Sequence, residues 1–215
     1  MRILTMLLGC VFSFAVWAQG PSVERYTQGV HYELLDKPVK TITPGKIEVT
    51  EAFAYSCGHC YNFEPLILSW EKKLADDVEL VKLPVIWRNS MQPLARIMYT
   101  GKALNKYKEV NARVFTALHK ERKRLGTEDE IAKIFEDVGV SKEDFKKTYN
   151  SFSVNTQVKQ AQARTHSMKI TGTPQMIVDG RYSVAATREM GHEGMLEVVD
   201  FLVEKIRAEK ASGKS

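Results

Sequence analysis

Apolar and polar residues recur along the chain in a pattern that predicts strands, then a long helical stretch, then strands again. Residues 47–55 and 78–85 are rich in β-branched and aromatic side chains, which predicts two strands. Between them, residues 61–75 carry apolar side chains at helical spacing, which predicts a helix. The C-terminal part predicts two further strands and a last helix, over 175–178, 181–184 and 194–208.

Helical periodicity fills the middle of the chain, in segments 93–100, 104–123, 128–138, 142–150 and 154–168. Thr127 and Ser141 each stand three residues before an acidic residue, which is typical of a capped helix start. No repeat or linker divides the chain. We therefore expect an α/β domain over 19–88 and 169–215, interrupted by an all-helical insertion over 89–168.

The first 18 residues have the pattern of a secretory signal peptide. Arg2 precedes an apolar stretch that ends at Trp17-Ala18, which predicts cleavage before Gln19. Two alternatives remain, a membrane anchor and a lipoprotein signal at Cys10. The apolar span is short for an anchor, since a bilayer needs about 20 residues, and apolar residues continue past Cys10. The expected location is a bacterial periplasm.

Composition narrows the class of protein but not its function. Of 215 residues, 44% are hydrophobic and 27% charged, which is ordinary for a globular protein and excludes collagen-like, coiled-coil and disordered classes. The net charge of +5 is spread among 26 acidic residues, so no nucleic-acid partner is expected. The basic run 119–124 is interpreted as a solvated helix face. Nothing in the sequence requires more than a monomer.

After cleavage, Cys57 and Cys60 are the only cysteines left, in the run Cys-Gly-His-Cys at the start of a predicted helix. Backbone N–H groups and the helix dipole favour a thiolate there, and a protonated His59 adds to this effect. In an exported chain such a pair predicts thiol–disulfide chemistry. The alternatives are a structural disulfide and a metal site using Cys57, His59 and Cys60, although the other histidines are scattered.

Three other positions are candidates for the same site. Glu51, six residues before Cys57, is placed to lie beneath the pair as a proton donor to the inner sulfur, the alternative being a solvent-facing strand residue. Lys82 is placed to pair with that carboxylate or with Glu64, unless it is a plain surface lysine. The Thr173-Pro174 bond is a candidate cis peptide, because cis bonds occur at X–Pro.

These motifs together resemble the DsbA family of periplasmic thiol:disulfide interchange proteins, in the thioredoxin-like superfamily. The resemblance rests on EAFAYSCGHCYNFEP at 51–65, VKLP at 81–84, HKERKRL at 119–125, TYNSF at 148–152 and TGTPQMIVDGRY at 171–182. It implies a thioredoxin-like fold with an inserted all-helical domain. It further implies that Cys57 is the exposed nucleophile, Cys60 its buried partner and Thr173-Pro174 a cis-proline loop, with Glu51, Glu64 and Lys82 around the buried sulfur.

The resemblance implies an oxidase that passes a redox-active Cys57–Cys60 disulfide to unfolded exported proteins, with no organic cofactor and no metal. It also implies reoxidation by a membrane partner of the quinone-linked DsbB type. Two residues depart from the family pattern: Gly58 stands where proline is most frequent, and Thr173 where valine is usual. Both favour a rival interpretation, a periplasmic reductase or isomerase kept in the reduced state.

Overall fold

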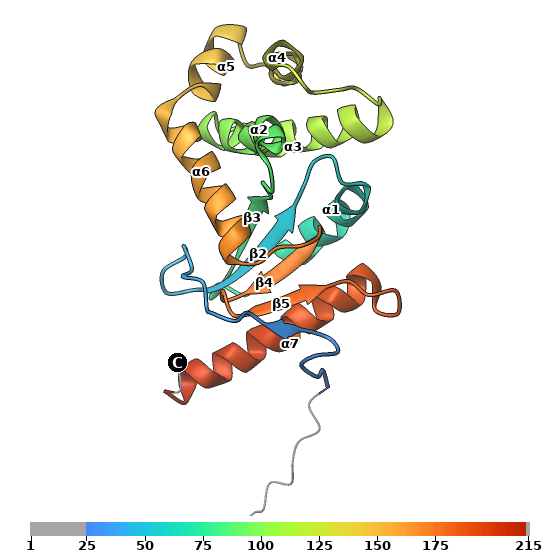
Figure 1. Cartoon of the computed structure of the whole chain (residues 1–215), viewed down its shortest axis with the longest axis vertical. Helices are drawn as coiled ribbons and strands as arrows, with labels where there is room; N and C mark the ends of the chain where they lie inside the picture. Colours follow the sequence, from blue (N-terminus) through green and yellow to red (C-terminus); the bar gives the residue numbers. More distant parts are fainter. Residues whose placement is uncertain (1–24, 214–215) are drawn as a thin grey trace, which may run out of the picture.

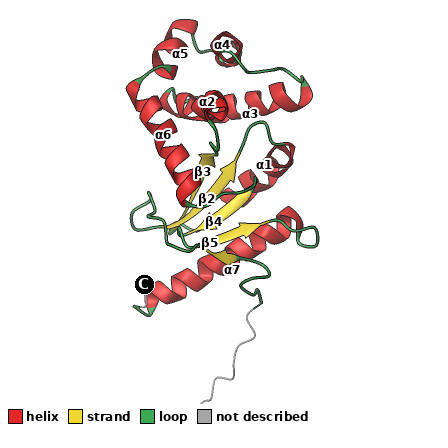
Figure 2. Ribbon diagram, viewed as in Figure 1, coloured by secondary structure: helices red, strands yellow, loops and turns green. Residues whose placement is uncertain are grey.

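A computed structural model describes residues 25–213, and its centre is one five-stranded sheet with helices around it (Figure 1, Figure 2). The strand order is β1-β5-β4-β2-β3, in which only β2 and β3 run parallel. The strands are β1 (Glu33–Leu34), β2 (Ile47–Phe53), β3 (Val78–Pro84), β4 (Gln175–Val178) and β5 (Tyr182–Ala185). The predicted succession of two strands, a helical stretch and two further strands is therefore present.

Strand β2 is flanked by β3 and β4, and all seven of its residues are buried. Its β-branched and aromatic side chains suit a strand covered on both faces. The register puts Glu51 opposite Lys82 of β3 and opposite Met176 of β4. A buried carboxylate is costly without a partner, and this register supplies a cation directly across the strand pair.

Helices cover both faces of the sheet. Helices α1 (Gly58–Glu71) and α7 (Gly191–Ala211) share a core with Val49 of β2. The opposite face presents Ala52, which packs in a second core with residues of α6 (Phe152–Ser167). Alternate residues of one strand thus enter different cores, as the two-residue period of a strand requires.

Between β3 and β4 the chain forms an all-helical layer, which lies above the sheet in Figure 1. Its elements before α6 are η1 (Asn89–Met91), α2 (Gln92–Ala103), α3 (Tyr107–Phe115), η2 (Thr116–Lys120), α4 (Glu128–Glu136) and α5 (Lys142–Tyr149). Thr127 forms a complete capping box with Glu130, and Ser141 caps α5 by accepting from the Asp144 N–H. Both predicted helix starts are confirmed.

The prediction of one helix over 104–123 is wrong. The chain turns after α2, where Asn105 has φ of 54°, and α3 begins only at Tyr107. The segment then changes to a π-helix and ends at Lys120. The apolar spacing continues across the turn, so periodicity alone could not reveal the turn.

Strand β1 was not predicted, because a strand of two residues is too short to show an alternating pattern.

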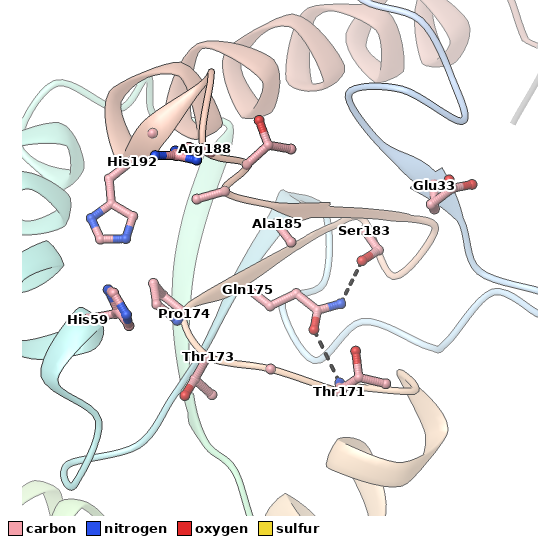
Figure 3. Close-up of a pocket in the computed structure, with 14 residues that line it drawn as sticks. Glu33, His59, Thr171, Thr173, Pro174, Gln175, Ser183, Ala185, Arg188 and His192 are labelled. Atoms are coloured by element: carbon pink, nitrogen blue, oxygen red, sulfur yellow. Dashed lines mark hydrogen bonds between the residues drawn. The ribbon is translucent and has the colours of Figure 1, made fainter.

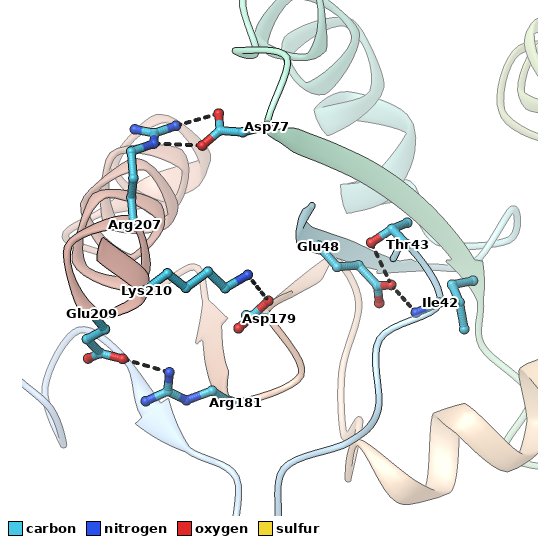
Figure 4. A network of polar contacts seen from close by, with 9 residues as sticks. All are labelled: Ile42, Thr43, Glu48, Asp77, Asp179, Arg181, Arg207, Glu209 and Lys210. Atoms are coloured by element: carbon cyan, nitrogen blue, oxygen red, sulfur yellow. Dashed lines mark hydrogen bonds and ion pairs between the residues drawn. The ribbon is translucent and has the colours of Figure 1, made fainter. Parts of the chain in front are cut away.

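The C-terminal end of α7 is fixed to the sheet by ion pairs (Figure 4). Arg207 binds Asp77, just before β3, through two bonds of 2.7 and 2.8 Å. Two further pairs join the helix to the β4–β5 turn, Arg181–Glu209 at 2.7 Å and Lys210–Asp179 at 3.5 Å.

Within the β4–β5 turn, Gly180 has φ of +63° and approaches the backbone of Val39 so closely that a side chain would not fit.

Some predictions concern residues or boundaries that the fold does not test. The predicted signal peptide, residues 1–18, and its cleavage site lie outside the described residues. The domain limits, 19–88 with 169–215 and 89–168, stay predictions. Between residues 25 and 213, no helix is long and apolar enough to cross a membrane.

Candidate active site

The two cysteines lie at the N-terminus of α1 and have different surroundings. Cys57 is the N-cap residue, and its Sγ accepts a hydrogen bond from the Cys60 N–H at 3.4 Å. Its own N–H donates to the Ala54 carbonyl at 3.0 Å, which holds the turn between β2 and α1. Cys57 is partly exposed, whereas Cys60 is buried, and both are free thiols in this structure. Only one of the two sulfurs is therefore open to an incoming thiol.

The same asymmetry extends to proton affinity. Burial alone would raise the pKa of the Cys57 thiol, but hydrogen bonds from the Thr173 side chain and the backbone of Cys60 and His59 outweigh it, so that this pKa is lowered. Burial is also the largest effect on Cys60, and there it raises the pKa far above that of an ordinary cysteine. Negative charge is thus stabilised on Cys57 and disfavoured on Cys60.

The loop before β4 lies against this pair. The Thr173–Pro174 peptide is cis, as the sequence suggested, and Pro174 is buried. The Cys57 Sγ–H donates to the Thr173 carbonyl oxygen at 3.3 Å. The Thr173 side chain also acts on the sulfur, since it lowers the pKa of the Cys57 thiol. Backbone and side chain of one residue therefore both face Cys57.

A charged triad of Glu51, Lys82 and Glu64 is buried beside the helix that carries the cysteines. The Lys82 Nζ lies 3.0 Å from Glu51 Oε2 and 2.5 Å from Glu64 Oε2. Burial raises the pKa of Glu51 to about 7, against the opposing attraction of Lys82. Burial alone would lower the pKa of Lys82, but Glu51 and Glu64 outweigh it and raise it. The solvent-facing alternatives for Glu51 and Lys82 are excluded.

A cavity of about 670 Å³ opens beside the cis-proline loop. Figure 3 shows the rings of His59 and His192 at one end, next to Pro174. The two ring centroids are 6.3 Å apart, and His192 also packs on Phe63 at 5.0 Å. Burial, and then the charge of His59, lower the pKa of His192. An extended chain bound in this cavity would pass directly by Thr173.

A family model described as a DSBA-like thioredoxin domain matches residues 81–197. The thiol:disulfide interchange protein DsbA of Pseudomonas aeruginosa is 39% identical over 206 residues, which cover 96% of each chain. Its Bordetella pertussis counterpart is 36% identical over 201 residues, which cover 93% of each chain. The chain belongs to the DsbA family.

Solved DsbA structures agree with this assignment. The crystal structure of Pseudomonas aeruginosa DsbA matches with a TM-score of 0.83 and 39% identity, covering 88% of this chain and 98% of that one. A DsbA oxidoreductase of Neisseria meningitidis matches with a TM-score of 0.76 and 27% identity, covering 86% and 96%. These matches confirm the thioredoxin-like fold with a helical insertion. They also show that this member of the DsbA family is a thiol:disulfide oxidoreductase.

Several residues close to the site of this DsbA relative had not been singled out from the sequence. His119 stacks on Tyr61 with centroids 4.8 Å apart, and its Nε2 is 2.7 Å from the Tyr55 carbonyl oxygen. Asn111 of α3 donates through Nδ2 to Glu64 Oε1 at 2.7 Å. The basic run that begins at His119 is exposed from residue 120 to 124, as expected, but the interpretation as a helix face is wrong, because the helical segment ends at Lys120. No sequence signal links positions 111 and 64, because their contact depends on how the insertion packs.

Metal binding was the alternative role for Cys57, His59 and Cys60. In the part of the chain that the structure describes, no group of three or more His, Cys, Asp or Glu side chains is placed to hold a metal ion. The pair itself has two sulfurs and one exposed imidazole nearby, short of the four ligands of a structural zinc site.

Proposed function

We propose that this protein oxidises pairs of cysteines in exported proteins by transferring a disulfide from Cys57–Cys60. The observation that carries the proposal is the asymmetry of the pair. Cys57 is partly exposed, hydrogen-bonded and low in pKa, and Cys60 is buried and high in pKa. Stabilising a thiolate favours the dithiol form over the disulfide, and this makes the disulfide a stronger oxidant.

The chemistry proceeds by two thiolate attacks. A substrate thiolate attacks Cys57 Sγ of the disulfide, the Cys57–Cys60 bond breaks, and its electron pair leaves on Cys60 Sγ. A second substrate thiolate then attacks the substrate sulfur of the mixed disulfide, and Cys57 leaves as a thiolate. The substrate loses two electrons as its disulfide forms, and the two protein sulfurs gain them.

The buried carboxyl of Glu51 supplies a proton to the departing Cys60 sulfur. A pKa of about 7 keeps much of Glu51 protonated near neutral pH, so that it can donate as the charge arrives. Glu64 is four residues after Cys60 on α1, and therefore on the same helix face. Lys82 balances whichever carboxylate is ionised.

The remaining site residues bind and orient. Thr173 and Pro174 position the substrate chain against Cys57, and a protonated His59 stabilises the Cys57 thiolate.

The redox-active disulfide is the only redox group the reaction needs, so we propose no organic cofactor and no metal. The substrates are unfolded exported proteins with free cysteines. The compartment is the periplasm, reached through cleavage after residue 18, and a membrane partner of the quinone-linked DsbB type reoxidises the pair. The protein acts as a monomer and binds no nucleic acid.

A reductase or isomerase held in the reduced state is the second candidate. Two residues favour it, namely Gly58 between the cysteines and Thr173 before the cis-proline. Gly58 has no atom within 4 Å of the position of a Cβ, so no packing requirement excludes a larger residue there. The choice of glycine thus bears on the chemistry of the pair rather than on space.

One equilibrium measurement separates the two candidates. The purified protein, residues 19–215, is equilibrated with mixtures of reduced and oxidised glutathione, and the Cys57 thiolate is titrated by its ultraviolet absorbance. An oxidase gives a strongly oxidising potential, an acidic Cys57 and rapid oxidation of a dithiol peptide. A potential close to that of thioredoxin, about −270 mV, supports the reductase or isomerase instead. Oxidation of the peptide by Cys57→Ser would overturn the proposed mechanism.

A further inference from the structure

Buried polar atoms without a protein partner gather around the Glu51 carboxylate. In residues 25–213, the hydroxyls of Tyr55 and Tyr107 and the Oδ1 of Asn111 are buried and accept or donate no hydrogen bond. Both oxygens of Glu51 also lack a hydrogen-bond partner, and only Oε2 has an ion pair, with Lys82. The sole other such side-chain atom in this part of the chain is Arg164 Nε. Unpartnered polar atoms are thus concentrated at the charged triad.

These atoms come from β2, the loop that follows it, and α3. Asn111 of α3 already donates to Glu64 of α1 at 2.7 Å. Tyr107 lies four residues before Asn111 on α3, and therefore on the same helix face. Burial, and then the charges of Glu64 and Glu51, raise the pKa of its hydroxyl. Burial, and then Tyr107, raise the pKa of Tyr55. Tyr55 and Cys60 belong to the same buried cluster, against which Tyr107 packs.

Buried polar groups in folded proteins find partners, and where the protein supplies none the partner is ordered water. An internal water needs two to four polar neighbours. Two phenol hydroxyls, an amide oxygen and two carboxylates meet that condition. Leaving them all unpaired would cost the full desolvation free energy of each group.

A second cavity, of about 510 Å³, reaches this cluster from a different part of the surface. Lys82 of β3, Tyr99 and Lys102 of α2, and Arg164 of α6 line it, and it shares no residue with the cavity beside the cis-proline loop. Lys82 lines the cavity and contacts both carboxylates through Nζ. The Lys102 ammonium lies over the Tyr107 ring at 5.4 Å from its centroid. Two lining residues therefore touch the buried cluster.

We propose that water molecules held by Tyr55, Tyr107 and Asn111 connect Glu51 to this second cavity and form a proton port. The inference rests on the proposed role of Glu51. When Glu51 gives its proton to the Cys60 thiolate, the water chain returns one proton from solvent to the Glu51 carboxylate. A substrate bound in the cavity beside the cis-proline loop does not obstruct this route, so protons and substrate enter on separate paths.

The test compares Tyr55→Phe/Tyr107→Phe with a control, Tyr182→Phe, which makes the same change on β5. Oxidised protein is mixed with excess dithiol, and single-turnover reduction of the Cys57–Cys60 disulfide is followed in H₂O and D₂O. We expect the double variant to react at least about tenfold more slowly, a fraction of the ~10²–10⁴-fold that a positioned proton donor contributes. We also expect a larger solvent isotope effect and an unchanged equilibrium potential. The control should match the parent protein.

A second measurement keeps the proposal testable if the double variant folds poorly. Magnetic relaxation dispersion of water nuclei counts long-lived internal waters, and Tyr107→Phe alone should hold fewer of them than Tyr182→Phe. Equal water counts, or equal reduction rates with equal isotope effects, overturn the port. Glu51→Gln separates this result from the role of Glu51 itself. If Glu51→Gln reduces at the parental rate, the role proposed for Glu51 fails, whereas a slow Glu51→Gln with a normal tyrosine variant rejects the port alone.

Discussion

Replacing Glu51 with glutamine should change how the stability of the reduced protein depends on pH. The Glu51 carboxyl is fully buried, and its pKa rises from 4.5 to about 7 on folding. The folded state therefore binds a proton more tightly than the unfolded state. The stabilisation from this proton is complete below about pH 4.5 and is lost as the pH rises through about 7.

The magnitude follows from the size of the shift. One pKa unit corresponds to about 1.4 kcal/mol, so ionising Glu51 withdraws about 3 kcal/mol of stability at high pH. Most of that loss, about 2.5 kcal/mol, falls between about pH 5 and about pH 8. Glutamine has a similar shape and does not ionise. The free energy of unfolding of Glu51→Gln, relative to the parent, should therefore increase by about 2.5 kcal/mol between these two pH values.

Urea unfolding of the reduced proteins, followed by circular dichroism, measures this difference. Glu79→Gln is the matched control, because Glu79 makes an exposed ion pair with Lys46 at 3.3 Å, and its pH dependence should follow the parent. A difference between Glu51→Gln and parent that stays constant within about 1 kcal/mol across this range would refute the reasoning. Glu51 would then be ionised throughout, and it could not serve as the proton donor to Cys60.

Three further variants test other parts of the structure. Thr173→Val removes a hydrogen bond to Cys57 and should raise the pKa of its thiol, measured by thiolate absorbance, while Thr171→Val should leave it unchanged. Thr127→Ala breaks the capping box of α4 and should lower the free energy of unfolding by about 1 kcal/mol in urea; no loss would mean that the cap contributes nothing. Gly180→Ala places a Cβ 1.9 Å from the Val39 carbonyl oxygen at a positive φ, and should cost at least about 2 kcal/mol in the same assay. If Gly180→Ala is as stable as the parent protein, the loop at Val39 can move away from the added Cβ without a cost in free energy.

The sequence predicted the limits of an element correctly where the residues within and next to that element determine them. Strand β4 has the predicted limits, Gln175–Val178, because a cis-proline loop and an Asp-Gly turn delimit it on both sides. Helix α1 begins at Gly58, three residues earlier than predicted. Its first turn has no apolar stripe, and its start depends on the Cys57 cap, which periodicity does not register.

The site was predictable to the extent that its residues lie in short motifs. Cys57, Cys60, Glu64 and Thr173-Pro174 could be singled out because their spacing is local or resembles a family pattern. Asn111 could not, since it reaches Glu64 only after the insertion has packed against α1. The burial of Glu51 depends on strand register, which the sequence leaves open.

The helical insertion is not an exchangeable module. Asn111 of the insertion donates to the buried Glu64, and Arg164 of α6 donates to the buried Glu48 at 2.6 Å. Replacing the insertion by recombination with another sequence would remove one donor from each of these carboxylates. Glu64 would keep Lys82, whereas Glu48 would lose the cation Arg164, and a buried carboxylate that loses its charged partner costs several kcal/mol. A helical segment that replaces this one must therefore supply a cation for Glu48, in addition to packing against the sheet.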